Sequence, residues 1–336
     1  MTIGKVINDY GINHSPYMGN LVNHLPMGQL ALYQMTHSLD KVEEYSRFFT
    51  RKSAIDPVDT NVNPVDSLKD CVGKRNLYAA CLLHTQAMVR EKGVDASVRE
   101  VLNQYPLGMS SGLFHVLIRL AYAVEGAGLE KDLAEEVARA LAYYVTAYRE
   151  VAVLERRIPA SDVADELTHL AKNPVIQQGL QRQPSLGKKM KFLYDNDVYK
   201  KEGFLIRGEE TEKVPGLLSA LVPIFMQSND IVVLHCITGL HALLTLKLFF
   251  DDFEESLDIY TTCCLTHLLT VENLDDQQRI PEKTKLDWKT LFQEGSESRD
   301  VHTIKFTYTG HQLENTHGYD KEKLREAVRF RIEKNG

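Results

Sequence analysis

The sequence lacks the features that mark secreted, nucleic-acid-binding and membrane-spanning proteins. Its five cysteines form no C-x-x-C pair, and Met1–Lys5 opens no apolar signal core, so we expect reduced thiols in a cytoplasmic protein. The 39 basic residues are outnumbered by 46 acidic ones and form no long stripe, which argues against a nucleic-acid partner. The apolar run Ile231–Phe250 contains two histidines and Lys247, which indicates a buried helix and no membrane span.

Motifs of several common enzyme classes are also missing. The sequence contains no H-E-x-x-H zinc motif, no Walker A loop and no G-x-G-x-x-G dinucleotide fingerprint. It shows no internal repeat and no heptad series either. The familiar zinc proteases, P-loop NTPases and dinucleotide-binding dehydrogenases are therefore poor matches, as are repeat proteins and coiled coils.

Hydrophobic periodicity predicts an all-α fold. Apolar residues recur at i, i+3, i+4 and i+7, and few segments alternate as strands do. We expect helices at Leu77–Arg90, Gly112–Val124, Lys131–Glu155, Val163–Leu170, Leu217–Met226, Ile231–Phe250, Ser256–Leu269 and Lys321–Glu333. Polar segments rich in proline or glycine predict loops at Asp56–Pro64, Asn173–Ser185, Lys201–Pro215 and Asp275–Lys285. None is long enough to force a division, so we expect one large helical domain spanning residues 1–336.

Local signals support some of these boundaries. Ser161 or Asp162 can cap the helix that leads from Val163 to Leu170. Asn173-Pro174 is expected to end that helix, because proline cannot continue the hydrogen-bond ladder. Gly126–Gly128 is expected to separate two helices in the same way.

Histidines in unusual settings are the main candidates for chemistry. Five of the twelve stand out: His24, His115, His235, His241 and His302. Three of these lie in otherwise apolar helical stretches, where a buried imidazole needs a hydrogen-bond partner or a metal. A single such histidine is usually a satisfied core residue, but several together favour a metal site, since neutral imidazole is the commonest metal ligand. A donor set rich in nitrogen points to iron, zinc, copper or nickel and away from magnesium or calcium.

Helical spacing adds geometric expectations. His302 and Lys305 are three residues apart, and His115 and Arg119 are four apart, so each pair shares a helix face. His235 and His241 are six apart, which places them on different sides of a straight helix. A break at the glycine between them, Gly239, would bring both inward; otherwise only one faces the site.

Four motifs in order resemble the questin oxidase-like family, in particular its shorter bacterial members. They are Asn23-His24-Leu25-Pro26-Met27, Phe114-His115 with Leu117–Tyr122, His235 with Thr238–Ala242, and His302 with Ile304-Lys305. The resemblance spans residues 23–305. It implies an all-helical oxygenase that acts on an aromatic or quinone substrate of polyketide type. The reaction would be either a Baeyer–Villiger-like oxygen insertion or an oxidative ring opening.

The resemblance also implies a cofactor and residue roles. Iron(II) would be held by four histidines and by a lysine carboxylated on its side-chain nitrogen, with dioxygen as co-substrate and NADPH as a candidate reductant. The metal ligands would be His24, His115, His302, Lys305 and either His235 or His241. Arg119 and Tyr122, in the same motif as His115, would be the catalytic residues. A small aromatic substrate is the expected partner, and the oligomeric state stays open.

Other interpretations remain open at the level of sequence. Lys305 could instead be a solvated lysine paired with Asp300 or Glu297, although burial would lower its pKa and allow the neutral amine to capture carbon dioxide. The chain could also be a helical ligand- or partner-binding protein whose histidines are polar core groups. A zinc hydrolase would use the same ligands, but no carboxylate stands where a general base is expected.

Overall fold

Helices make up most of the structure, as the periodicity predicts. The computed structural model describes residues 1–59, 62, 64–271, 287–319 and 321–335. The helices of the N-terminal half are α1 (Ile3–Gly11), α2 (Leu25–Thr36), α3 (Leu39–Lys52), α4 (Leu68–Cys71), α5 (Tyr78–Lys92), α6 (Val94–Gln104), α7 (His115–Leu129) and α8 (Ala134–Thr146). Those that follow are α9 (Val163–Ala171), α10 (Pro174–Gln181), α11 (Leu186–Asp195), α12 (Asp197–Glu202), α13 (Glu210–Ser228), α14 (Ile231–Thr245), α15 (Phe253–Leu268), α16 (Trp288–Glu297), α17 (Val301–Asn315) and α18 (Lys321–Asn335).

Two small sheets add to the helical fold. Strands β1 (Tyr17–Met18) and β2 (Leu21–Val22) form an antiparallel pair directly before α2. Strands β3 (Arg157–Ile158) and β4 (Leu205–Ile206) form a parallel pair. The expectation of an all-α single domain is therefore confirmed for its helical character, with these short strands as the exception among the described residues.

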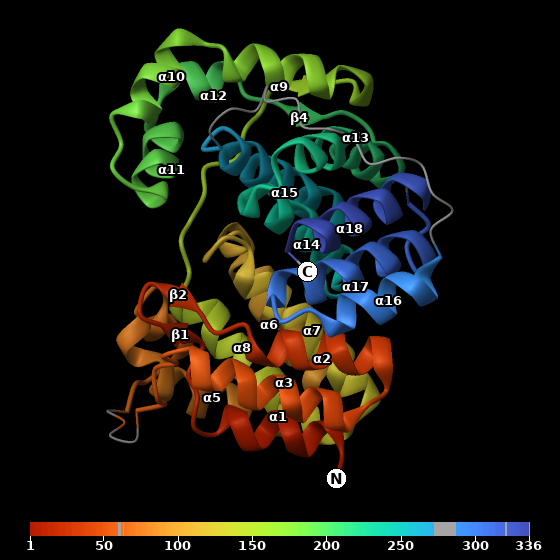
Figure 1. Cartoon of the computed structure of the whole chain (residues 1–336). Helices are drawn as coiled ribbons and strands as arrows, with labels where there is room; N and C mark the ends of the chain where they lie inside the picture. Colours follow the sequence, from red (N-terminus) through yellow and green to blue (C-terminus); the bar gives the residue numbers. More distant parts are fainter. Residues whose placement is uncertain (60–61, 63, 272–286, 320, 336) are drawn as a thin grey trace.

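Helices α2, α7, α14 and α17 pack against one another. Helix α7 packs against α2, α8 and α14, while α17 packs against α2, α14, α16 and α18. Figure 1 shows α1, α2, α3 and α5 at the lower end of the molecule, with α13 to α18 above them and α9 to α12 at the opposite, upper end. The buried apolar side chains of α7 and α14 are part of one continuous core. No helix among the described residues is both long and apolar enough to span a bilayer.

Several predicted helix ends are wrong. The helix expected at Lys131–Glu155 stops at Thr146, where the chain leaves α8 and runs without helix towards β3. The helix expected at Ile231–Phe250 ends at Thr245 and is followed by a short 3-10 turn. Gly126–Gly128 does not separate two helices but lies inside α7, because Gly126 lets Leu30 and Leu133 approach closely. Tertiary packing thus outweighs the local tendency of glycine to end a helix.

Two predicted loops contain helices. Asn173 does follow the end of α9, but it also caps α10 by accepting hydrogen bonds from the backbone N–H groups of Val175 (3.0 Å) and Ile176 (3.3 Å). Pro174 occupies the first turn of α10, where a missing N–H costs nothing. Pro215 lies inside α13, in the segment expected to be a loop. Described residues of Asp56–Pro64 are irregular as expected, and Asp275–Lys285 lies outside the described residues.

Candidate metal centre

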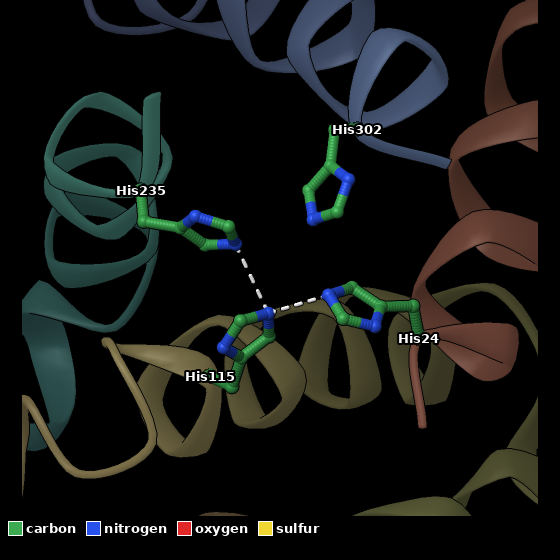
Figure 2. Close-up of side chains that lie close together, drawn as sticks. All are labelled: His24, His115, His235 and His302. Carbon is green, nitrogen blue, oxygen red and sulfur yellow. Dashed lines mark hydrogen bonds between the residues drawn. The ribbon is translucent and has the colours of Figure 1, made fainter. Parts of the chain in front are cut away.

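Four of the histidines singled out in the sequence come together between four helices. His24, His115, His235 and His302 each offer a ring nitrogen, and these nitrogens all lie within 4.8 Å of one another. Figure 2 shows the four rings pointing into a common space, each from a separate helix. His115 and His235 are buried, whereas His24 and His302 are partly exposed, so one side of the group is accessible.

The motif Asn23–Met27 holds His24 at the beginning of α2. The Asn23 side chain accepts a hydrogen bond from the Leu25 N–H (3.0 Å) and donates one to the Ser15 carbonyl (2.9 Å). Pro26 fits the first helical turn, where its ring imposes a helical φ and its missing N–H is not needed. His24 therefore stands at the N-cap position, with its backbone fixed on both sides.

His115 follows an unusual turn. Gly112, Leu113 and Phe114 all have positive φ, at 60°, 58° and 63°. This conformation suits glycine but is unfavourable for leucine and phenylalanine, and it persists where the surroundings impose it. Phe114 is held by the rings of Tyr260 and His267, with centroids 5.0 and 4.9 Å away. The turn brings the Gly112 carbonyl to the His115 ring, which donates to it from Nδ1.

His235 and His302 are also fixed by groups near the starts of their helices. His235 Nδ1 donates to the Ile231 carbonyl one turn earlier (2.6 Å). Asp300 caps α17 through the N–H groups of His302 and Thr303, and its Oδ1 lies 3.4 Å from His302 Nδ1. Arg331 in turn donates to Asp300 Oδ2 (2.7 Å). This carboxylate–imidazole arrangement is common behind metal-ligating histidines.

The hydrogen bonds determine which ring nitrogen carries the proton. A carbonyl oxygen can only accept a hydrogen bond. Nδ1 of His24 lies 2.6 Å from the Val22 carbonyl, so this nitrogen must carry the proton. The same holds for Nδ1 of His115 and of His235, which also face backbone carbonyls. In a neutral ring Nε2 then carries a lone pair. Nε2 of His115 lies 2.6 Å from that of His24 and 3.0 Å from that of His235. Lone pairs this close repel unless a cation lies between them, so the donor set fits a bound metal.

The charge state of the rings agrees with this geometry. Burial and the proximity of the other imidazoles and of Lys305 hold the pKa values of His24, His115 and His235 well below their usual range. Burial also lowers the pKa of His302, although Asp300 opposes the shift. At neutral pH these rings are therefore uncharged and can act as metal ligands.

Lys305 lies beside the four histidines and is fully buried. Its Nζ has no hydrogen-bond partner in the described part of the chain. Burial lowers the pKa of Lys305 to about 7. The solvated alternative is therefore wrong: Glu297 pairs with Lys41, and Asp300 pairs with Arg331.

His241 does not join the histidine group. Helix α14 continues unbroken through Gly239, so His235 and His241, six residues apart, face different sides of it. Gly239 does not break the helix but allows α14 to pack closely against Phe114, because a Cβ at this position would lie 2.9 Å from the Phe114 ring. The His241 ring instead lies near Glu125 and Tyr308.

Arg119 and Tyr122 lie on α7 beyond His115 and are both buried. Arg119 forms an ion pair with Glu136 of α8 (2.7 Å). Burial lowers the pKa of the guanidinium, but the charge and hydrogen bond of Glu136 and the nearby tyrosines together raise it. Tyr122 lies against Tyr308, with ring centroids 5.6 Å apart. The structure thus places Arg119 in a salt bridge between helices and Tyr122 beside Tyr308 of α17.

Sequence reasoning missed three contributors to this region. The strained turn before His115 has only a Gly-rich composition as its signal. Asp300 could have been recognised as a capping residue two positions before His302. Glu125 is a lone acidic residue in the apolar stretch that becomes α7, and burial raises its pKa to about 8.

Gly108–Gly112 has the G-x-S-x-G spacing of serine hydrolases, but the structure does not place it in their setting. It follows α6 and a 3-10 turn, with no strand before it. Ser110 and Ser111 are buried, and the Ser111 hydroxyl accepts the Arg149 N–H (2.8 Å). A strand-to-helix turn that presents the serine is required for that chemistry.

The fold and the site together define a mainly helical protein with a four-histidine centre that can hold a metal ion. The family profile described as Questin oxidase-like matches residues 21–309, and the chain belongs to this family. The resemblance inferred from the motifs is thereby confirmed, and membership implies an oxidoreductase. No curated protein sequence matches the chain significantly.

Proposed function

We propose that the protein is an iron-dependent oxygenase that acts on an aromatic or quinone substrate of polyketide type. The observation that carries the proposal is the convergence of Nε2 lone pairs from His24, His115 and His235, with His302 beside them. Family membership supports oxidative chemistry on such substrates. The reaction would be a Baeyer–Villiger-like oxygen insertion or an oxidative ring opening.

Iron fits this donor set better than the other metals that bind imidazole. The site is rich in nitrogen and has no carboxylate among its four close donors, which disfavours magnesium and calcium. Zinc has no redox chemistry, so it does not suit an oxidoreductase site of this kind. When bound, iron(II) would supply electrons for the activation of dioxygen, and we propose NADPH as the source of further electrons.

Lys305 is proposed as a fifth ligand in carboxylated form. Its neutral amine would attack carbon dioxide, forming an N–C bond and releasing one proton, and the product is an anionic carbamate. Burial beside imidazoles supports this role, as does the lack of a partner for Nζ among the described residues. The helix starts at His24, His115 and His302 also favour a negative charge here, because helix N-termini carry partial positive charge.

The two residues expected to be catalytic take different proposed roles. Arg119 is proposed as a positioning residue, because its salt bridge to Glu136 ties α7 to α8 behind His115. Tyr122 is proposed to face the substrate, since its ring lies beside Tyr308 on the inner side of α17.

Elemental analysis of protein purified without oxygen and reconstituted with iron(II) tests the metal. We expect about one iron per chain, as one group of four histidines predicts. His235→Ala should lose the iron while keeping its helical circular dichroism. His84→Ala is the matched control, because His84 lies outside the four-histidine group and hydrogen-bonds to the Val65 carbonyl. Stoichiometric zinc that iron cannot replace, or a metal-free protein, would contradict the proposal and favour a hydrolase or a non-catalytic binding protein.

A further inference from the structure

A second group of polar side chains lies on three of the helices that carry the metal-centre histidines. Glu125 and Tyr122 come from α7, His241 from α14 and Tyr308 from α17; we call these four the Glu125 group. None of them belongs to the four-histidine cluster. Lys305 and Tyr308 are three residues apart on α17, so the two sites are neighbours along one helix.

The Glu125 group contains an unfilled hydrogen-bonding position. His241 is buried, and its Nε2 has no partner in the part of the chain that the structure describes. The nearest acidic oxygen, Oε1 of Glu125, is 3.8 Å away, which is too far for a hydrogen bond. The Tyr308 hydroxyl lies by the Glu125 carboxyl and lowers its pKa, against the larger effect of burial. An oxygen atom from a ligand could bridge the imidazole and the carboxyl.

The group is accessible although most of it is buried. The Glu125 side chain keeps 19% of its surface exposed, whereas His241 keeps 2%. His317, which is half-buried, lies over the His241 ring with centroids 5.9 Å apart. A ligand can therefore approach from the Glu125 side.

Charge and shape indicate the class of ligand. Burial raises the pKa of Glu125 to about 8 and lowers that of His241 to about 3, so at pH 7 they are mainly an acid and a neutral imidazole. Such a pair offers hydrogen-bond donors and acceptors without net charge. The rings of Tyr122 and His241 lie 5.6 and 5.9 Å from that of Tyr308, which provides aromatic surface. An aromatic ring bearing a neutral hydroxyl or carbonyl oxygen matches both properties.

We propose that the Glu125 group binds a phenolic hydroxyl of the aromatic substrate, with Glu125 and His241 as the residues that recognise it. This inference rests on the proposed function, because it names how the substrate of the neighbouring metal centre is held. It adds a specificity-determining site that is separate from the metal ligands.

Calorimetric titration of the iron-loaded protein with anthraflavic acid, a dihydroxyanthraquinone that does not chelate metals, tests the inference. At slightly acidic pH, where the phenols stay neutral, wild type should bind it more tightly than unsubstituted anthraquinone. Glu125→Leu and His241→Phe, which remove hydrogen bonding at similar volume, should each weaken binding of the dihydroxy probe about tenfold, the effect of losing one buried hydrogen bond. Binding of anthraquinone should change little. Glu100→Leu, an exposed change on α6, is the matched control.

The outcomes separate this inference from the proposed function. Loss of preference for the hydroxylated probe in both variants, with iron content unchanged, supports the recognition site. Equal binding of both probes by wild type, or no binding of either, overturns it even if the protein holds iron. Should one variant fail to fold, the other variant and the wild-type comparison of the two probes still decide whether the Glu125 group recognises the hydroxyl. Absence of iron would instead contradict the proposed function.

Discussion

At the scale of single residues, the candidate centre depends on the orientation of each imidazole as much as on its identity. The Val22, Gly112 and Ile231 carbonyls accept hydrogen bonds from Nδ1 of His24, His115 and His235. The Nε2 lone pairs of these three rings therefore point toward one another. Such partners are local in sequence, yet they depend on backbone conformations that residue types do not reveal. The strained turn at Gly112–Phe114 is the clearest case. Ligand identity could be proposed from sequence, but ligand orientation could not.

Lys305 provides the sharpest test at this scale. Lys305→Arg should lose most of the iron, because a guanidinium can neither react with carbon dioxide nor ligate. Lys305→Glu should retain part of it, since a carboxylate is restored on a shorter side chain. Iron per chain is the measurement, with labelled bicarbonate and carbon NMR to detect the carbamate in wild type. An unmodified amine in fully iron-loaded protein would contradict the carbamate and leave the histidine site intact.

At the scale of elements, the sequence predicts which segments are helical better than where they end. Long periodic segments such as Ile231–Thr245 are found as helices, because one pattern of buried side chains extends over several turns. The errors fall where tertiary packing outweighs local signals. Gly126 lies inside α7, and Pro215 lies inside α13, where burial of its apolar neighbours offsets the lost hydrogen bond. The choice between His235 and His241 as the metal ligand likewise required knowing that α14 is unbroken at Gly239.

The contact between α14 and the turn before α7 gives a prediction at this scale. In Gly239→Ala the new Cβ would lie 2.9 Å from the Phe114 ring, so α14 must shift away from the turn that orients His115. We expect a loss of about 1–3 kcal/mol in the free energy of unfolding, as for other overpacked cores, and weaker iron binding. Chemical denaturation and iron titration measure the two effects.

Gly128→Ala is the control for this change. Gly128 also lies in a helix, but a Cβ there would meet nothing within 4 Å. Alanine should therefore keep or slightly raise stability, by about 0.5–1 kcal/mol, because it favours the helix over the unfolded chain. Equal effects of the two substitutions would show that close packing at Gly239 is unimportant.

At the scale of the whole molecule, the core around the two sites holds several ionisable groups in or near their neutral forms. Three histidines, Lys305 and Glu125 all have pKa values shifted by burial in the direction that removes charge. The histidines and Lys305 lie between helices that meet at the proposed metal site. Glu125 lies further along one of these helices, α7. Their titrations make stability depend on pH, and the contributions differ in sign. Bases with lowered pKa values destabilise the fold as pH falls, whereas an acid with a raised pKa destabilises it as pH rises.

Glu125 allows one of these contributions to be isolated. Its pKa is about 8 in the folded protein against an ordinary value of 4.5, so between these values the folded protein keeps a proton that the unfolded chain has released. The free energy of unfolding should therefore fall as pH rises through this window, by up to about 1.4 kcal/mol per pH unit, and level off above it. Glutamine does not titrate. The difference in free energy of unfolding between wild type and Glu125→Gln therefore cancels the pH dependence contributed by the histidines and Lys305. What remains is the pH dependence contributed by Glu125. Denaturation at a series of pH values measures this difference. A flat difference between pH 5 and 8 would mean that Glu125 ionises normally in the folded protein, which would remove the neutral acid on which recognition of a phenolic hydroxyl depends.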